Sequence, residues 1–111
     1  MISQLTKPSI GRIVHYSLSD QDADEINRRR VAKPHEPGWP AGAQAHSGSY
    51  AIGGQLAPLI VTAVWTDVCI NGQVMLDGND SLWVASRLAS GVEGGPAAPS
   101  PGFWHWPERV E

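Results

Sequence analysis

The stretch that decides the fold runs from Leu76 to Leu88 and reads Leu-Asp-Gly-Asn-Asp-Ser-Leu-Trp-Val-Ala-Ser-Arg-Leu. Its centre, Asp77-Gly78-Asn79-Asp80, supplies the backbone conformations that a tight reversal of the chain needs. Apolar and polar residues alternate on both sides of this turn, which predicts a β-hairpin. In its second strand, 81–88, alternation places Leu82, Val84 and Leu88 on one face and Trp83, Ala85 and Arg87 on the other.

Two further strands are predicted upstream of the hairpin. Residues 10–18 are rich in β-branched side chains and alternate without a purely apolar face. The segment from Pro58 to Trp65 is apolar on both faces, which is typical of a central strand.

Two positions compete for the turn that follows this central strand. Asn71-Gly72 is a standard hairpin dipeptide, and Thr66-Asp67 also permits a turn. We prefer the turn at 66–67, because a single strand over 68–77 then puts its apolar residues on one face. That choice leaves Gly72 as a bulge or as a site of close approach.

One short helix is predicted to begin at Ser19. Acids at 22, 24 and 25 lie in its first turn and Arg28, Arg29 and Arg30 in its last, which matches the helix dipole. Ala23 and Ile26 form a narrow apolar stripe, and Pro34 is expected to end the helix.

The remaining segments complete a mainly β (α+β) fold. Twelve glycines and nine prolines indicate many turns, and they concentrate in two long loops, 33–54 and 89–102. The aromatic run Phe103-Trp104-His105-Trp106 predicts an edge strand ended by Pro107. Four or five short antiparallel strands with one short helix predict a small barrel or curved sheet, similar to the SH3-like class, in a single domain spanning 1–111.

Charge and cysteine content narrow the function. A net charge of -3 is unsuited to coating a long nucleic acid but permits a small anionic ligand. The longest apolar run, Leu56 to Trp65, is too short to span a bilayer, and one cysteine, Cys69, fits a reducing cytosol. We therefore expect no membrane partner and an intracellular protein.

Catalytic and metal-binding motifs are missing from the sequence. The four histidines and Cys69 lack metal-ligand spacing, and no nucleophile elbow or phosphate-binding loop is present. We therefore expect a non-enzyme with no cofactor and no metal.

The tryptophan content is the strongest anomaly in the composition. Five tryptophans occur in 111 residues. We expect Trp65 to fill the core, whereas exposed tryptophans are suited to stacking on bases or to anchoring an interface. Trp104 and Trp106 alternate with His105, so their rings are predicted to share one face of the C-terminal segment. If this segment pairs beside strand 81–88, the rings converge with Trp83 and Arg87, which share a face in this interpretation.

Four segments resemble one family of small, mostly uncharacterised proteins of tailed bacteriophages and prophages. They are Ile10-Gly11-Arg12-Ile13-Val14-His15-Tyr16, the segment 23–30 ending Ile-Asn-Arg-Arg-Arg, the stretch 76–86, and Trp104-His105-Trp106-Pro107-Glu108. The resemblance covers most of the chain outside 31–54 and 91–101, which are longer and richer in glycine and proline than expected. It implies a phage origin, as an intracellular accessory protein or a virion component, and it carries no activity.

Small phage proteins often act by binding, and one group sequesters the nucleotide messengers of bacterial antiphage defence. By this analogy we expect a homo-oligomeric sponge for a small nucleotide in the host bacterial cytoplasm. Its expected ligand-binding residues are His15, Tyr16, Arg28, Arg29, Trp83, Arg87, Trp104, His105 and Trp106. A protein-binding or virion-associated module is the alternative, and a nucleotide-degrading enzyme is the third hypothesis.

Overall fold

The structure is a computed structural model that describes residues 7–31, 37–40 and 45–108. Within these ranges the regular elements are β1 (Ile13–Ser17), α1 (Asp20–Val31), β2 (Leu56–Val64), β3 (Cys69–Met75), β4 (Ser81–Leu88) and β5 (Trp104–His105). The predicted strands and helix are all present. β1 begins later than predicted, because Ile10 and Gly11 form a turn in which Gly11 has a φ of 92°.

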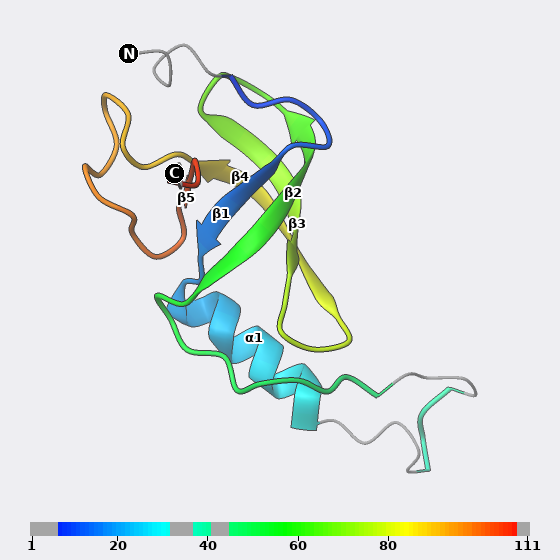
Figure 1. The fold of residues 1–111 in the computed structure, drawn as a ribbon. Coiled ribbons are helices and arrows are strands. Elements are labelled where there is room, and N and C mark those ends of the chain that lie inside the picture. Colours follow the sequence, from blue (N-terminus) through cyan, green and yellow to red (C-terminus); the bar gives the residue numbers. More distant parts are fainter. Residues whose placement is uncertain (1–6, 32–36, 41–44, 109–111) are drawn as a thin grey trace.

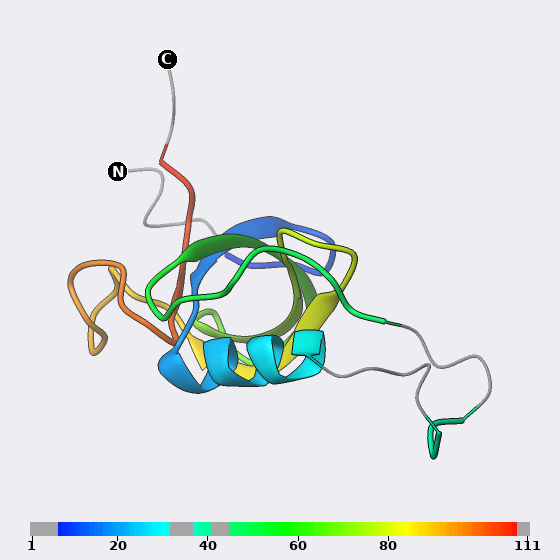
Figure 2. The ribbon, with the colours of Figure 1, turned by 90° about the horizontal axis from the view of Figure 1, so that it is seen from below.

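The strands of the described chain form one antiparallel sheet in the order β4-β3-β2-β1-β5. The sheet curls until β5 meets the chain just beyond β4, where Ala89 and Trp104 form a parallel bridge. There the Ser90 backbone N–H donates to the Trp104 carbonyl at 2.8 Å. Viewed from below, the strands trace a ring (Figure 2). The prediction of a small, curved antiparallel sheet with one short helix is confirmed.

The partner of β5 differs from the one expected. β5 pairs with β1, with His15 opposite His105 and Tyr16 opposite Trp104. The condition raised from the sequence, that the C-terminal aromatic segment pairs beside the strand 81–88, is therefore not met along β4. The curl of the sheet brings this segment to the first strand and leaves a single bridge after β4.

Helix α1 lies below the curled sheet and along one side of the ring (Figures 1 and 2). The Ser19 hydroxyl accepts from the Asp22 backbone N–H, and the Asp22 carboxylate accepts from the Ser19 backbone N–H, each at 3.0 Å. This reciprocal cap confirms the predicted start. Ala23 and Ile26 are buried, as the apolar stripe predicted. Pro34 lies outside the described residues, which follow the helix to Val31.

The core fills the inside of the curl with apolar side chains. It comprises Val14, Tyr16, Leu18, Ala23, Ile26, Ala51, Leu59, Val61, Ile70, Val74, Leu82, Val84, Ala89 and Trp104. Trp65 is not part of it: its side chain is 62% exposed, so the expectation that Trp65 fills the core is wrong. The large ring in the core is Trp104, whose Nε1 donates to the Val68 carbonyl at 3.1 Å.

Gly72 is the site of close approach that the sequence predicted. The register between β3 and β4 shifts beside it, and so does the register between β2 and β3 after Val61, which pairs with Gly72. A Cβ atom on Gly72 would lie 2.7 Å from the Ile60 carbonyl oxygen and closer still to the Leu59 side chain. Only a residue without a side chain lets β2 and β3 pass here.

A bulge in β4 reverses the predicted alternation. Ile70 pairs with Arg87 and Gly72 with Val84, so β4 has one more residue than β3 between these pairs. Ser86 takes a φ of 54° at this point. The inserted residue turns Arg87 toward the core side and leaves Leu88 48% exposed. The expectation that Trp83 and Arg87 share a face is therefore wrong, and so is the placement of Leu88 beside Leu82 and Val84.

The predicted loops carry little regular structure where the structure describes them. Within 37–40 and 45–54, Gly48 forms an isolated β-bridge with Gly78. The Asn27 amide holds Ala51 in place: its NH₂ group donates to the Ala51 carbonyl and its oxygen accepts from the Ala51 backbone N–H, each at 2.8 Å. Residues 90–102 consist of turns and bends. In the described part of the chain, no helix has the length and apolar character needed to cross a membrane.

Candidate ligand-binding site

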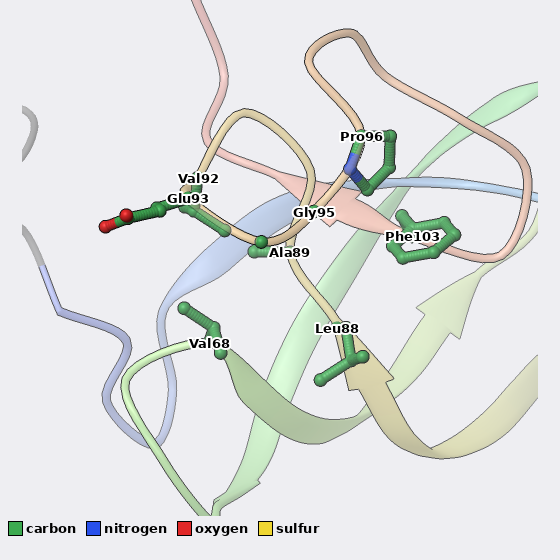
Figure 3. A pocket seen from close by; sticks show the side chains of 9 residues that line it. Val68, Leu88, Ala89, Val92, Glu93, Gly95, Pro96 and Phe103 are labelled. Atoms are coloured by element: carbon green, nitrogen blue, oxygen red, sulfur yellow. The ribbon is translucent and has the colours of Figure 1, made fainter.

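An apolar hollow lies where the end of β4 meets the loop before β5 (Figure 3). Its volume is about 260 Å³. It is lined by Val68, Leu88, Ala89, Val92, Glu93, Gly94, Gly95, Pro96 and Phe103. Glu93 supplies the one charge in this lining, so the hollow suits a flat or aliphatic group.

A polar hollow of about 320 Å³ lies next to it. It is lined by Ser19, Gln21, Ser86, Arg87, Leu88, Gly102 and Phe103. Leu88 and Phe103 line both hollows and form a shared wall. Polar residues therefore line the hollow on one side of this wall, and mostly apolar residues line the hollow on the other side.

Arg87 is placed in the polar hollow by the bulge at Ser86. Its Nε donates to the Tyr16 hydroxyl at 2.9 Å, and its NH1 group donates to the Ala85 carbonyl at 2.8 Å. The NH2 group lies 3.5 Å from the Asp22 carboxylate, and the side chain remains 32% exposed. Burial lowers the pKa of Arg87, but Tyr16 and Asp22 raise it by more, so the pKa lies above its ordinary value. The guanidinium is a fixed cation.

Tyr16 links this cation to the helix. Its hydroxyl donates to Asp22 Oδ2 at 2.5 Å while it accepts from Arg87. Burial and the hydrogen bond to the Asp22 carboxylate raise the pKa of Tyr16 to about 12. The phenol therefore stays protonated and holds β1, α1 and β4 together.

Tyr16 and Trp104, two of the nine expected ligand-binding residues, have no surface to offer a ligand. Tyr16 is 0% exposed and Trp104 is 1% exposed. Their burial assigns them to the core, because the ring of strands closes over both side chains. Among the nine residues, Arg87 is the one that lines a described hollow.

The two histidines among the expected ligand-binding residues, His15 and His105, lie together on the outer side of the sheet. His15 and His105 are cross-strand partners with ring centroids 5.6 Å apart and an interplanar angle of 85°. Burial and the neighbouring His15 lower the pKa of His105, although Glu108 opposes this shift. The structure therefore brings these two expected ligand-binding residues together, but neither lines a described hollow.

Trp106 lies on the other side of β5 from His105. Its ring packs edge-on against Trp104 at 5.6 Å, which confirms that these two rings share a face. The guanidinium of Arg12 lies 4.9 Å above the Trp106 ring. Arg12 was not among the expected site residues. Strand alternation did place it on the same face as Val14, which is the signal that could have indicated this contact.

The two expected helix arginines have different surroundings. Arg28 is exposed, whereas Arg29 donates to Asp80 Oδ2 at 3.2 Å and to the Ser81 carbonyl at 3.1 Å. Arg30 donates to Asp80 Oδ1 at 2.8 Å. The Asp80 side chain is 3% exposed. This buried carboxylate pairs with Arg29, which was expected to bind phosphate, and with its neighbour Arg30.

The predicted turn 77–80 thus has a second role. Besides receiving α1 through Asp80, it binds the segment 45–49: the Ser49 hydroxyl donates to the Asp77 carboxylate at 2.6 Å, and Ser47 and Asn79 exchange hydrogen bonds at 2.9 Å. The turn therefore joins the hairpin, the helix and part of the long loop.

The linings of the two hollows contain two serines and one carboxylate, Glu93, and no histidine or cysteine. In the described ranges no three histidine, cysteine or acidic side chains cluster as metal ligands. Phe103 and Leu88 were missed as site residues, because the loop and the bulge that place them leave no periodic signal. Comparisons with protein families, with curated proteins and with solved structures find no match.

Proposed function

We propose that this chain is a non-catalytic binding protein that sequesters a small nucleotide. The observation that carries the proposal is the fixed Arg87 cation in a polar hollow that shares Phe103 and Leu88 with an apolar hollow. A concave site with one convergent charge and a perturbed pKa is the usual form of a ligand site. A base would pack against Phe103, and a phosphate would face Arg87.

The surroundings of Arg87 support a small anion over a polymer. Asp22 offsets part of its charge, but the hollow also lies at the start of α1, where backbone N–H groups and the helix dipole favour negative charge. Each hollow has a volume near the lower end of the range for ligand pockets, about 300 Å³. This size suits a mononucleotide or cyclic nucleotide and leaves no channel for a strand.

The biological setting of the proposal comes from the resemblance to small phage proteins. In that setting the protein lowers the concentration of a nucleotide signal of antiphage defence in the bacterial cytoplasm, which requires affinity and abundance without turnover. We include a homo-oligomer in the proposal, because a second subunit against the open side would deepen a shallow site.

A nucleotide screen with matched variants tests the proposal. The protein is heated with cyclic nucleotides, mononucleotides and ADP-ribose derivatives, and a raised Tm with intact ligand recovered after heating is expected for one of them. Leu88→Trp fills the shared wall from a half-exposed position and is expected to abolish the shift. Trp83→Ala changes a residue that lines neither hollow, and it is the control that is expected to keep the shift. An unchanged Tm with every nucleotide in the panel would refute nucleotide binding.

A protein-binding module is the second candidate, and the exposure of Trp65 and Trp83 favours it. These two rings are 62% and 57% exposed on the outer side of the sheet. Exposed aromatic side chains in a neutral setting are typical of interfaces.

The third hypothesis is an enzyme. In the nucleotide screen, recovery of a chemically altered ligand would support it.

A further inference from the structure

Asn71-Gly72, the dipeptide that competed for a turn in the sequence, lies in the middle of β3. The pairing with β4 is irregular beside it, because β3 has the single residue Asn71 at the point where β4 has two, Ala85 and Ser86. Asn71 is therefore the residue of β3 that stands opposite the β-bulge.

Two features make this bulge unfavourable by itself. Ser86 has a φ of 54°, in the left-handed region, where a residue with a side chain is strained. The extra residue of a bulge also has no partner in the ladder, so its backbone N–H needs an acceptor from elsewhere. A bulge at this position therefore requires a side chain that accepts from Ser86.

The Asn71 amide supplies that acceptor. Its Oδ1 accepts from the Ser86 backbone N–H at 2.7 Å and from Trp65 Nε1 at 2.9 Å. Because both partners can only donate, the atom between them is the oxygen of the amide rather than its NH₂ group. Trp65 lies in the turn between β2 and β3, so the amide is held from two sides with its oxygen on the bulge.

The placement of Arg87 depends on this bulge. An uninterrupted ladder would put Leu88 on the core side and Arg87 on the outer side, as strand alternation predicts. With the extra residue, Arg87 points inward and its Nε donates to the Tyr16 hydroxyl at 2.9 Å. The bulge also provides the Ala85 carbonyl, which accepts from the NH1 group of Arg87 at 2.8 Å. Among the residues that line the two described hollows, Arg87 is the one cation.

We infer that Asn71 is a positioning residue, whose amide oxygen holds the bulge at Ser86 and thereby directs Arg87 into the polar hollow. Asn71 lines neither hollow, so it acts through these two residues. A binding contact is only as precise as the residues that support it. The consequence for ligand affinity rests on the proposed function, in which Arg87 faces the phosphate, but the placement of Arg87 does not.

Gln73 provides a matched control on the same strand. It lies two residues beyond Asn71, is also partly buried, and its Oε1 accepts from the Ser81 hydroxyl of β4 at 3.1 Å. Gln73→Ala therefore removes a hydrogen bond of the same kind between β3 and β4, at a point where the register is regular. An effect that comes only from a looser sheet would appear in this variant as well.

Exchange of the Arg87 Nε proton with water tests the placement of Arg87 without any ligand. In ¹⁵N NMR spectra of the full chain, this signal is identified by its loss in Arg87→Lys. It is expected to exchange slowly, because the proton is donated to the buried Tyr16 hydroxyl. Asn71→Ala is expected to accelerate the exchange about tenfold or more. Asn71→Asp keeps an acceptor oxygen at the same position, so its exchange rate, and that of Gln73→Ala, should stay within about twofold of wild type.

Nucleotide titration then measures the consequence for binding. For a nucleotide that raises the Tm of the wild-type protein, Asn71→Ala is expected to weaken affinity about tenfold, and Gln73→Ala to leave it unchanged. If no nucleotide binds to the wild-type chain, the proposed function fails, and the exchange rates decide whether Asn71 positions Arg87. An unchanged exchange rate in Asn71→Ala would overturn the inference, and so would an equal acceleration in Gln73→Ala or the loss of slow exchange in Asn71→Asp.

Discussion

Replacing Tyr16 by phenylalanine removes one hydroxyl group from the centre of the contact between β1, α1 and β4. That hydroxyl donates to Asp22 and accepts from Arg87 in a side chain that is 0% exposed. Phenylalanine keeps the ring in the core but leaves the Asp22 carboxylate without one donor and Arg87 Nε without its acceptor. We expect a loss of about 2 kcal/mol in the free energy of unfolding at pH 8, because hydrogen bonds to charged groups contribute about 1.5–3 kcal/mol.

The same variant has a distinct pH signature. The fold raises the pKa of Tyr16 from 10.0 to about 12, so it stabilises the protonated phenol. This stability is fully present below pH 10 and is lost as the pH rises toward 12. Between pH 8 and pH 11 the wild-type chain is expected to lose on the order of 1 kcal/mol through this group alone, since pH 11 lies one unit above the ordinary pKa of a phenol and one unit of pKa corresponds to 1.36 kcal/mol. Tyr16→Phe has no phenol at this position, so its free energy of unfolding does not show this part of the decrease at alkaline pH.

Urea denaturation of both proteins at pH 8 and pH 11 measures this difference. The gap between wild type and Tyr16→Phe is expected to narrow from about 2 kcal/mol to under 1 kcal/mol. Tyr50→Phe is the matched control, because Tyr50 is 74% exposed and is expected to leave both values unchanged. A gap between wild type and Tyr16→Phe that stays constant over this range would show that burial and the hydrogen bond to Asp22 do not hold the phenol protonated.

Three other substitutions test the remaining structural assignments. Asp80→Ala leaves the 9% exposed Arg30 side chain without its carboxylate and is expected to cost about 3 kcal/mol in urea denaturation, against no measurable change for the exposed Arg28→Ala. Gly72→Ala forces a Cβ atom against the Ile60 carbonyl and should cost about 2 kcal/mol, and an unchanged Tm would contradict the close approach. Trp104→Ala leaves a cavity in the core and should lower the free energy of unfolding by about 4 kcal/mol. Trp65→Ala changes an exposed side chain and should lower the Tm by less than a degree or two.

Local signals in the sequence were sufficient for the elements. The start of α1 was predictable because Ser19 and Asp22 cap each other across three residues, and the β3–β4 hairpin because its turn residues tolerate the required backbone angles. The close approach at Gly72 followed from the strand pattern around it. In each case the signal that predicted the feature lies in residues only a few positions apart.

The candidate site depended on contacts that the sequence does not display. Alternation placed Arg87 beside Trp83, but one extra residue at Ser86 reversed the side to which Arg87 points and brought it to Tyr16, 71 positions away. The shared wall of Phe103 and Leu88 arises where a loop returns to the end of β4. Neither outcome has a periodic signature.

The tryptophans show the same division most clearly. The sequence by itself determined that the chain is rich in indole rings, that Trp104 and Trp106 share a face, and that the fold is built from short antiparallel strands. Only the tertiary structure decided that Trp104 is buried while Trp65 and Trp83 face outward. The physical reason is that strand periodicity divides the side chains between two faces of a strand but does not determine which face is buried. That assignment comes from the curl of the sheet, which joins β5 to β1 and closes over one set of rings.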